Sequence, residues 1–244
     1  MNGNPATLIP VALFLLLGLG ITFFVRYQSR KRRETGFVSE YFIGSRSLGA
    51  FVLAMTTIAT YGSVSSFVGG PGQAWNVGFG WVYMATIQVT ALFLLYGIMG
   101  KKMALVSRKL GAITVIDVIR ARYQSNALAN ISAIVIVLFF GATMVAQFVG
   151  GAKLFEAVTG YSYEVGLAIF GIAAILFTAL GGFRGVAFVD TLCGIAMIVG
   201  IFVLAGGILN AGGGYTNIME NLQTHNPQLL DPLGGGDMPI GLYF

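Results

Sequence analysis

The stretch Leu53-Ala-Met-Thr-Thr-Ile-Ala-Thr-Tyr-Gly-Ser-Val-Ser-Ser-Phe-Val-Gly-Gly-Pro-Gly72 decides the fold. It is apolar enough for a membrane helix, yet Ser and Thr crowd its middle, Gly62 interrupts it and Gly-Gly-Pro-Gly closes it. An interrupted helix survives in hydrocarbon only against protein or a polar cavity, because each unpaired backbone group costs several kcal/mol. Freed carbonyls and hydroxyls are hard oxygen ligands that suit a small alkali cation. The pattern predicts a binding site at this break; the alternative is that the small residues only let helices pack closely.

The composition places the whole chain in a membrane. Hydrophobic residues make up 56% of the 244 residues and charged residues 9%, whereas soluble domains carry roughly 25% charged residues. Segments of about 20 apolar residues are long enough to cross a bilayer. They predict an all-α integral membrane protein with about six spans, at 8–25, 48–70, 74–100, 127–149, 163–181 and 186–209.

The loop charges predict the orientation of these spans. Thirteen of the fourteen Lys and Arg residues fall in loops on one side, and only Lys153 falls on the other. Basic loops remain in the cytoplasm, so we expect an external N-terminus. The net charge of +5 therefore reports topology, and we expect no nucleic-acid partner.

The loops between spans have their own patterns. Residues 101–126 are amphipathic and predict a cytoplasmic interfacial helix. Residues 210–238 are rich in Gly, Asn and Pro and predict an external loop. At 239–244 the chain turns apolar again, which is typical of the start of a seventh helix.

Three polar side chains lie inside apolar segments. Asp190 either lines an ion path or pairs with Arg184 nearby. Gln88 and Gln147 are amides that need partners in lipid, so each either joins helices or contacts a substrate.

Residue patterns of an enzyme are absent from the sequence. There is no Ser-His-Asp set, Gly-rich phosphate loop or His/Cys cluster. The single Cys193 lies in an apolar segment, and His225, the only histidine, has no Cys or His partner nearby in the sequence. We expect neither an enzyme nor an organic cofactor.

Several motifs together resemble the sodium:solute symporter family, over essentially the whole chain. They are Tyr41-Phe-Ile-Gly-Ser-Arg-Ser47, Ala59-Thr-Tyr61, Ser65-Ser-Phe-Val-Gly-Gly-Pro-Gly72, Gly78-Phe-Gly-Trp81, Gly100-Lys-Lys102, Ala121-Arg-Tyr-Gln-Ser125, Gln147-Phe-Val-Gly-Gly-Ala152 and Gly181-Gly-Phe-Arg184.

This resemblance implies a leucine-transporter-type fold built from two inverted five-helix repeats. Residues 1–47 would then hold an extra N-terminal helix with its basic loop, and 48–209 would be the first repeat. Residues 210–244 would hold an external loop and the start of the seventh helix. The chain would correspond to the N-terminal half of a family member.

The resemblance also implies the sites. Sodium would bind the backbone carbonyls of Ala59 and Gly62 and the hydroxyl of Ser63, with Asp190 on its exit path. Substrate contacts are expected from Thr60, Tyr61, Ser66, Gln88 and Gln147.

Two positions differ from relatives. Some relatives have an aspartate at the position of Tyr61. Sugar-transporting relatives have a sugar-binding glutamate at the position of Ala85. The alanine here argues against a sugar substrate and fits a substrate that is itself an anion. The expected function is sodium-coupled import of a small organic anion across the bacterial inner membrane by alternating access, with pantothenate as the expected substrate. Alternatives are another solute such as proline, or the membrane input domain of a sensor.

Overall fold

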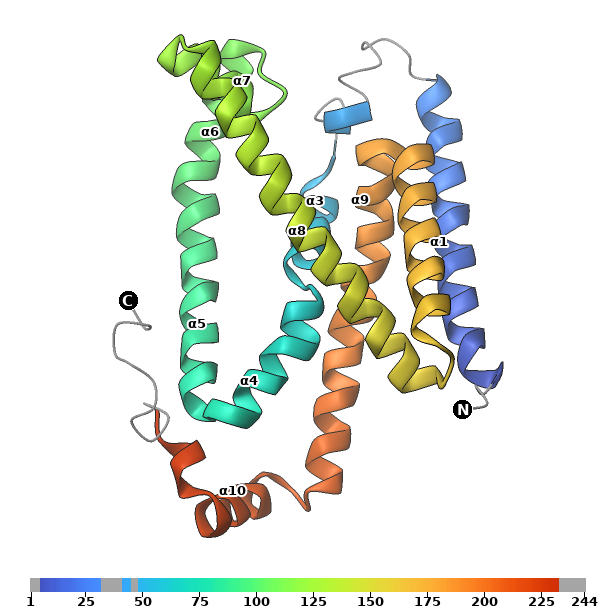
Figure 1. The fold of residues 1–244 in the computed structure, drawn as a ribbon, viewed down its shortest axis with the longest axis vertical. Coiled ribbons are helices and arrows are strands. Elements are labelled where there is room, and N and C mark those ends of the chain that lie inside the picture. The colour runs from blue at the N-terminus through green and yellow to red at the C-terminus, as the bar shows by residue number, and fades with distance from the viewer. Residues whose placement is uncertain (1–4, 32–40, 45–47, 233–244) are drawn as a thin grey trace. The chain divides into compact units, whose positions relative to one another are not determined.

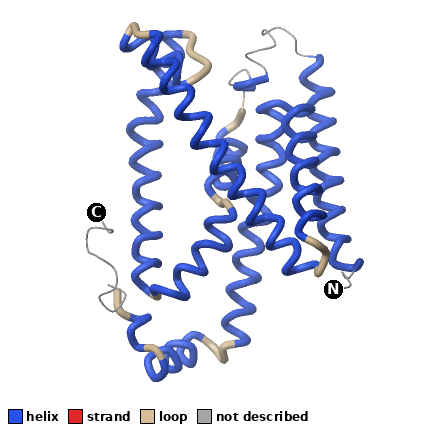
Figure 2. Tube along the Cα trace, viewed as in Figure 1, coloured by secondary structure: helices blue, strands red, loops and turns tan. Residues whose placement is uncertain are grey.

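The computed structural model describes residues 5–31, 41–44 and 48–232, and these residues form helices joined by short turns, without a strand (Figures 1 and 2). The chain divides into two compact units, residues 1–64 with 113–197 and residues 65–112 with 198–244. Each unit is described by itself. The helices are α1 (Pro5–Lys31), α3 (Ala50–Tyr61), η2 (Ser65–Gly69), α4 (Gly70–Val77), α5 (Phe79–Leu94), η3 (Leu95–Gly100), α6 (Lys101–Leu110), α7 (Val115–Tyr123), α8 (Asn126–Thr159), α9 (Tyr163–Ala211), α10 (Tyr215–His225) and η4 (Pro227–Leu230).

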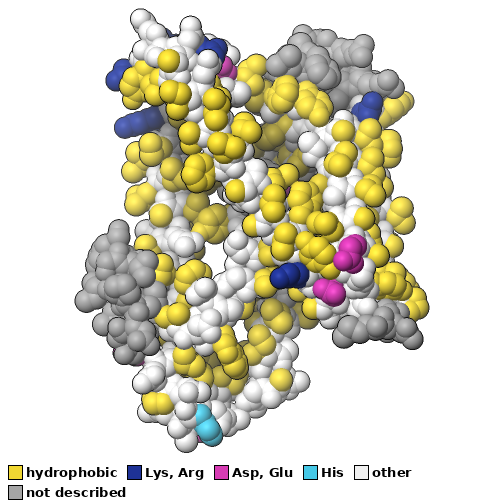
Figure 3. Space-filling model, viewed as in Figure 1, with side chains coloured by type: hydrophobic (Ala, Val, Ile, Leu, Met, Phe, Trp, Pro, Cys, Tyr) yellow, Lys and Arg dark blue, Asp and Glu magenta, His cyan; other side chains and the backbone are white. Residues whose placement is uncertain are grey.

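The outward surfaces of the long helices are apolar, as lipid requires. On α8, Val137, Leu138 and Phe139 are 70%, 66% and 72% exposed. Hydrophobic side chains spread over the face drawn in Figure 3, where charged side chains are few. By length and composition, four of the described helices can cross a membrane, or five if α3 and the segment Ser65–Val77 form one broken span.

In the first unit, α1 packs along the beginning of α9 through small residues (Figure 1). A Cβ on Gly18 would meet the ring of Phe177 at 2.9 Å, and one on Gly181 would meet Thr22 Cγ2 at 3.1 Å. Thr22 is fully buried and donates its hydroxyl hydrogen bond to the carbonyl of Gly18 (2.8 Å) within its own helix. Small residues allow this close approach between membrane helices.

Gly182 breaks the 49-residue segment α9. A continuous helix of that length would extend ~74 Å, more than twice the apolar thickness of a bilayer. Gly182 adopts φ 56° and ψ −166°, which L side chains rarely adopt. It lies between the spans expected at 163–181 and 186–209, and the chain reverses direction there (Figure 1).

Gly182→Ala should lower the amount of folded protein severalfold. The substitution forces a side chain into a positive φ, which costs roughly 1 kcal/mol or more. Its Cβ would also meet Tyr41 Cδ2 at 3.0 Å and the Tyr41 carbonyl at 3.1 Å. Fluorescence-detected size-exclusion chromatography measures the effect. Gly171→Ala is the matched control, because nothing lies within 4 Å of the added Cβ; equal losses in both variants would contradict the prediction.

The expected interfacial helix at 101–126 is two helices. Helix α6 follows α5 directly through the π-helical turn η3 and ends at Gly111, which is left-handed (φ 64°). Helix α7 begins after the capping box of Thr114 and Asp117, in which each side chain accepts the other's backbone N–H. Hydrogen bonds from the backbone and hydroxyl of Thr114 lower the pKa of the Asp117 carboxyl. The amphipathic pattern indicated a helix but missed the glycine that divides it.

The expected external loop at 210–238 contains helical structure as well. Helix α10 and the 3-10 turn η4 occupy much of it, and η4 packs against α4 and α5 in the second unit. His225 lies in the last turn of α10, exposed, with Nδ1 3.0 Å from the Asn221 carbonyl. Residues 239–244, expected to begin a seventh helix, lie outside the described part of the chain.

Candidate functional site

Helix α3 ends at Gly62, as the sequence predicts. The Gly62 N–H still donates to the carbonyl of Ile58 (2.7 Å), but Gly62 and Ser63 are not helical, and the chain resumes as a helix at Val64. The last carbonyls of a helix have no partner within it, and Ala59 lies in this last turn. The carbonyls of Ala59 and Gly62, which the family resemblance assigns to sodium, both lie at this break.

The predicted end of the broken segment at Gly69–Gly72 is wrong. The π-helical turn η2 runs through Ser65–Gly69, and α4 continues to Val77. Pro71 stands in the first turn of α4, where its missing N–H would have had no partner in the helix. The helix therefore continues through Pro71 rather than ending there.

Gln147 of α8 reaches the break. Its Oε1 accepts a hydrogen bond from the backbone N–H of Val64 (2.9 Å), in a partly buried position. Three residues further along α8, Gly150 faces the side chain of Val64 so closely that a Cβ at this position would overlap Cγ1. Residues three apart share a helix face, so Gln147 and Gly150 contact Val64 from one face of α8.

The second part of α9 lies on another side of α3. A Cβ on Gly62 would meet Met197 Sδ at 3.0 Å, and a Cβ on Gly194 would meet the Met55 carbonyl at 3.2 Å. On the same side, Thr56 donates its hydroxyl hydrogen bond to Oδ2 of Asp190. Asp190 therefore contacts α3 through Thr56.

The remaining predicted residues divide between the units. Ser63 and Ala59 are half-buried at the break, and Thr60 and Tyr61 are exposed at the end of α3. The exposed residues Ser66 in η2 and Gln88 in α5 belong to the second unit.

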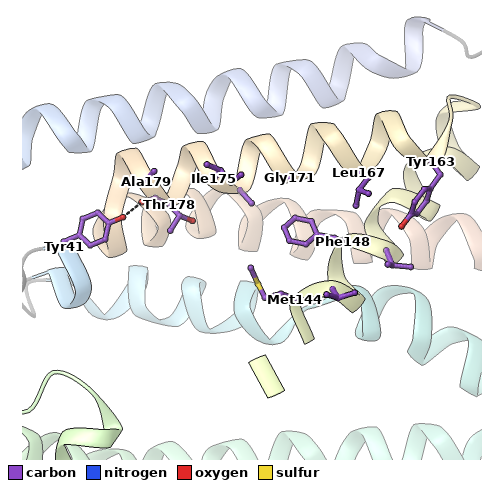
Figure 4. A pocket seen from close by; sticks show the side chains of 12 residues that line it. Tyr41, Met144, Phe148, Tyr163, Leu167, Gly171, Ile175, Thr178 and Ala179 are labelled. Atoms are coloured by element: carbon purple, nitrogen blue, oxygen red, sulfur yellow. Dashed lines mark hydrogen bonds between the residues drawn. The ribbon is translucent and has the colours of Figure 1, made fainter. Parts of the chain in front are cut away.

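An apolar groove of about 760 Å³ lies in the first unit, and none of the predicted site residues lines it. It is lined by α8, the beginning of α9 and Tyr41, and Figure 4 shows Phe148, Tyr163 and Leu167 along it. At one end, Tyr41 Oη donates to the carbonyl of Thr178 (3.1 Å). With so few oxygens, this groove does not suit a small cation.

Sequence reasoning missed several contacts of the break. Thr56 is one of many hydroxyl residues in this stretch, and Thr56 and Thr60 follow the i, i+4 spacing of one helix face. That face was the available signal for a partner of Asp190. Gly150 and Met197 carry no signal in a single sequence, because small and flexible apolar residues are common throughout it.

A family model describes most of this chain. Residues 41–239 match the model of the sodium:solute symporter family. The chain belongs to this family. Its apolar helices and this membership together make it a multi-pass membrane protein.

Individual symporters of the family are similar to the chain at two levels. The sodium/pantothenate symporter of Escherichia coli K12 is 46% identical over 231 residues, covering 95% of this chain and 47% of the relative. That of Haemophilus influenzae is 40% identical over 235 residues, covering 96% and 48%. A sodium/proline symporter of Staphylococcus aureus is 28% identical over 207 residues, covering 84% and 40%. The chain spans about half the length of these relatives.

Proposed function

We propose that this chain carries the sodium-binding break of a symporter that imports a small organic anion. The observation that supports it most is the interruption of α3 at Gly62 within a chain that belongs to the sodium:solute symporter family. The ion would bind the carbonyls of Ala59 and Gly62 and the hydroxyl of Ser63. These are hard oxygens without formal charge, a set that suits a monovalent cation better than a divalent one.

The substrate would bind beside the ion. Contacts would come from Thr60, Tyr61, Ser66 and Gln88, which offer hydroxyl and amide donors to an anion. The relatives that are 40% and 46% identical are described as pantothenate symporters, and the proline symporter is 28% identical. We therefore propose pantothenate as the substrate, with proline as the alternative.

The proposed architecture is the leucine-transporter type, with six spans in this chain. Helix α1 would be the extra N-terminal helix, and the spans within 48–209 would form the first five-helix repeat. The break at Gly182 supports this count, because it divides α9 into two segments that are each long enough to cross a bilayer. The basic loops would face the cytoplasm of a bacterial inner membrane, with the N-terminus outside.

Coupling would arise because sodium and substrate share one broken helix. Sodium that orders the break raises the affinity for substrate, and substrate raises the affinity for sodium equally, typically by 1–3 kcal/mol. The membrane potential adds about 2.3 kcal/mol per charge per 100 mV. Asp190 would attract the ion on its path to the cytoplasm.

Transport by the full-length protein tests this proposal. Vesicles containing it should accumulate labelled pantothenate roughly tenfold faster with an inward sodium gradient than with potassium, as a coupling of this size implies. Labelled proline in the same vesicles distinguishes the two substrates. Equal pantothenate uptake in sodium and potassium would contradict sodium coupling, and uptake of proline alone would contradict the substrate.

A further inference from the structure

The backbone N–H of Val64 lies at the start of the helix that follows the break. It lies three residues after Tyr61, the last residue of α3, and belongs to the first turn of the following helix, where a backbone N–H has no partner within the helix. A donor without a partner in a low-dielectric interior costs the full penalty of desolvation. The Oε1 atom of Gln147 removes that penalty at 2.9 Å.

The orientation of the Gln147 amide follows from this contact. A backbone N–H can only donate, so the oxygen of the side-chain amide, and not its nitrogen, must face Val64. A side chain that accepts a hydrogen bond at this place fixes the path of residues 62–64. It therefore fixes the directions of the carbonyls that precede Val64.

A second contact independently brings α8 to the same place. Gly150 leaves room for the side chain of Val64, which a Cβ at position 150 would overlap. The neighbouring Gly151 has no such function, because its Cβ would meet only the ring of Phe170 at an ordinary 3.7 Å. The backbone and the side chain of Val64 thus both contact α8.

We propose that Gln147 is a positioning residue that holds the break of α3 in its ion-binding shape, with Gly150 as the seat for Val64. This inference rests on the proposed sodium site at the break. It replaces a direct substrate contact as the role of Gln147 and makes α8 part of the ion site without supplying a ligand.

Two variants of Gln147 test the inference in the full-length protein. Gln147→Leu should raise the sodium concentration for half-maximal uptake about tenfold, equivalent to ~1.4 kcal/mol. The substrate KM at saturating sodium should stay unchanged. Gln147→Glu keeps an acceptor oxygen, so its sodium concentration for half-maximal uptake should stay close to the wild-type value. A substrate contact would instead show a raised KM at saturating sodium, and this result would overturn the inference.

The pair Gly150→Ala and Val64→Ala tests the seat. Gly150→Ala should raise the sodium concentration for half-maximal uptake, as Gln147→Leu does. Adding Val64→Ala should return that concentration to the wild-type value, because the smaller side chain makes room for the added Cβ. Gly151→Ala is the matched control. If Gln147→Leu fails to reach the membrane, this pair still decides: no effect of Gly150→Ala, or no rescue by Val64→Ala, overturns the inference.

Hydrogen–deuterium exchange separates this inference from the proposed function. The amide of Val64 should exchange slowly in wild type and in Gln147→Glu and at least tenfold faster in Gln147→Leu, as loss of one hydrogen bond implies. Unchanged exchange in Gln147→Leu overturns the positioning role. Wild-type uptake that ignores sodium would refute the proposed function whatever the exchange rates.

Discussion

Gly62→Pro should abolish sodium-dependent uptake while the protein still reaches the membrane. Proline removes the N–H that donates to the Ile58 carbonyl, so α3 would end earlier and the Ala59 carbonyl would turn away. Its ring would also crowd the Ile58 carbonyl and Met197 Sδ, each 3.0 Å from a Cβ placed here. Proline inside a helix costs about 3 kcal/mol, so we expect a loss of roughly 100-fold in uptake at low sodium.

Two milder variants show whether the break itself is responsible. Gly69→Ala changes a glycine of the same stretch that has open space around it, and should transport normally. Ser63→Ala removes one hydroxyl and should raise the sodium concentration needed without abolishing uptake. Normal sodium dependence in both Gly62→Pro and Ser63→Ala would remove this segment from the ion site.

Asp190→Asn should slow transport roughly tenfold or more and weaken its sodium dependence, with nearly normal protein abundance. The substitution keeps the size of the side chain and an oxygen that can accept from Thr56, but removes the charge that attracts a cation. A hydrogen bond to a charged group contributes about 1.5–3 kcal/mol, more than one to a neutral amide. Uptake at several sodium concentrations, normalised to protein in the membrane, measures both effects.

Variants of Thr56 and Arg184 supply the controls for Asp190. Thr56→Ser keeps the hydroxyl and should transport normally, whereas Thr56→Val should resemble a milder Asp190→Asn. The double variant Asp190→Asn, Arg184→Gln restores charge balance without restoring a carboxylate. If that double variant transports normally, Asp190 has no role on the ion path.

The site could be predicted where its chemistry is local in the sequence. Gly62 among hydroxyl residues identified the end of α3, because a glycine and competing side chains weaken a helix wherever they occur. Asp190 and Gln147 stood out because polar groups in apolar segments need partners. Their partners, Thr56 and the backbone of Val64, depend on how distant segments pack, which a single sequence does not specify.

The fold shows the same division. Apolar length predicted long apolar helices, because the bilayer sets a minimum length for a helix that crosses it, and four or five such helices are present among the described residues. The ends of helices were predicted less well: Pro71 lies in the first turn of α4, Gly111 separates α6 from α7, and α10 forms in a segment expected to be a loop. In each case the same residue type can begin, divide or follow a helix, and the neighbouring turns decide.

The turn at Gly182 also has a consequence for biogenesis. Its neighbours are Tyr41 and, through Gly181, Thr22 of α1, and all of these are synthesised more than a hundred residues earlier. N-terminal segments emerge from the ribosome first. Helix α1 is thus synthesised before α9. When α9 is made, the reversal at Gly182 packs against residues of the chain that are already present.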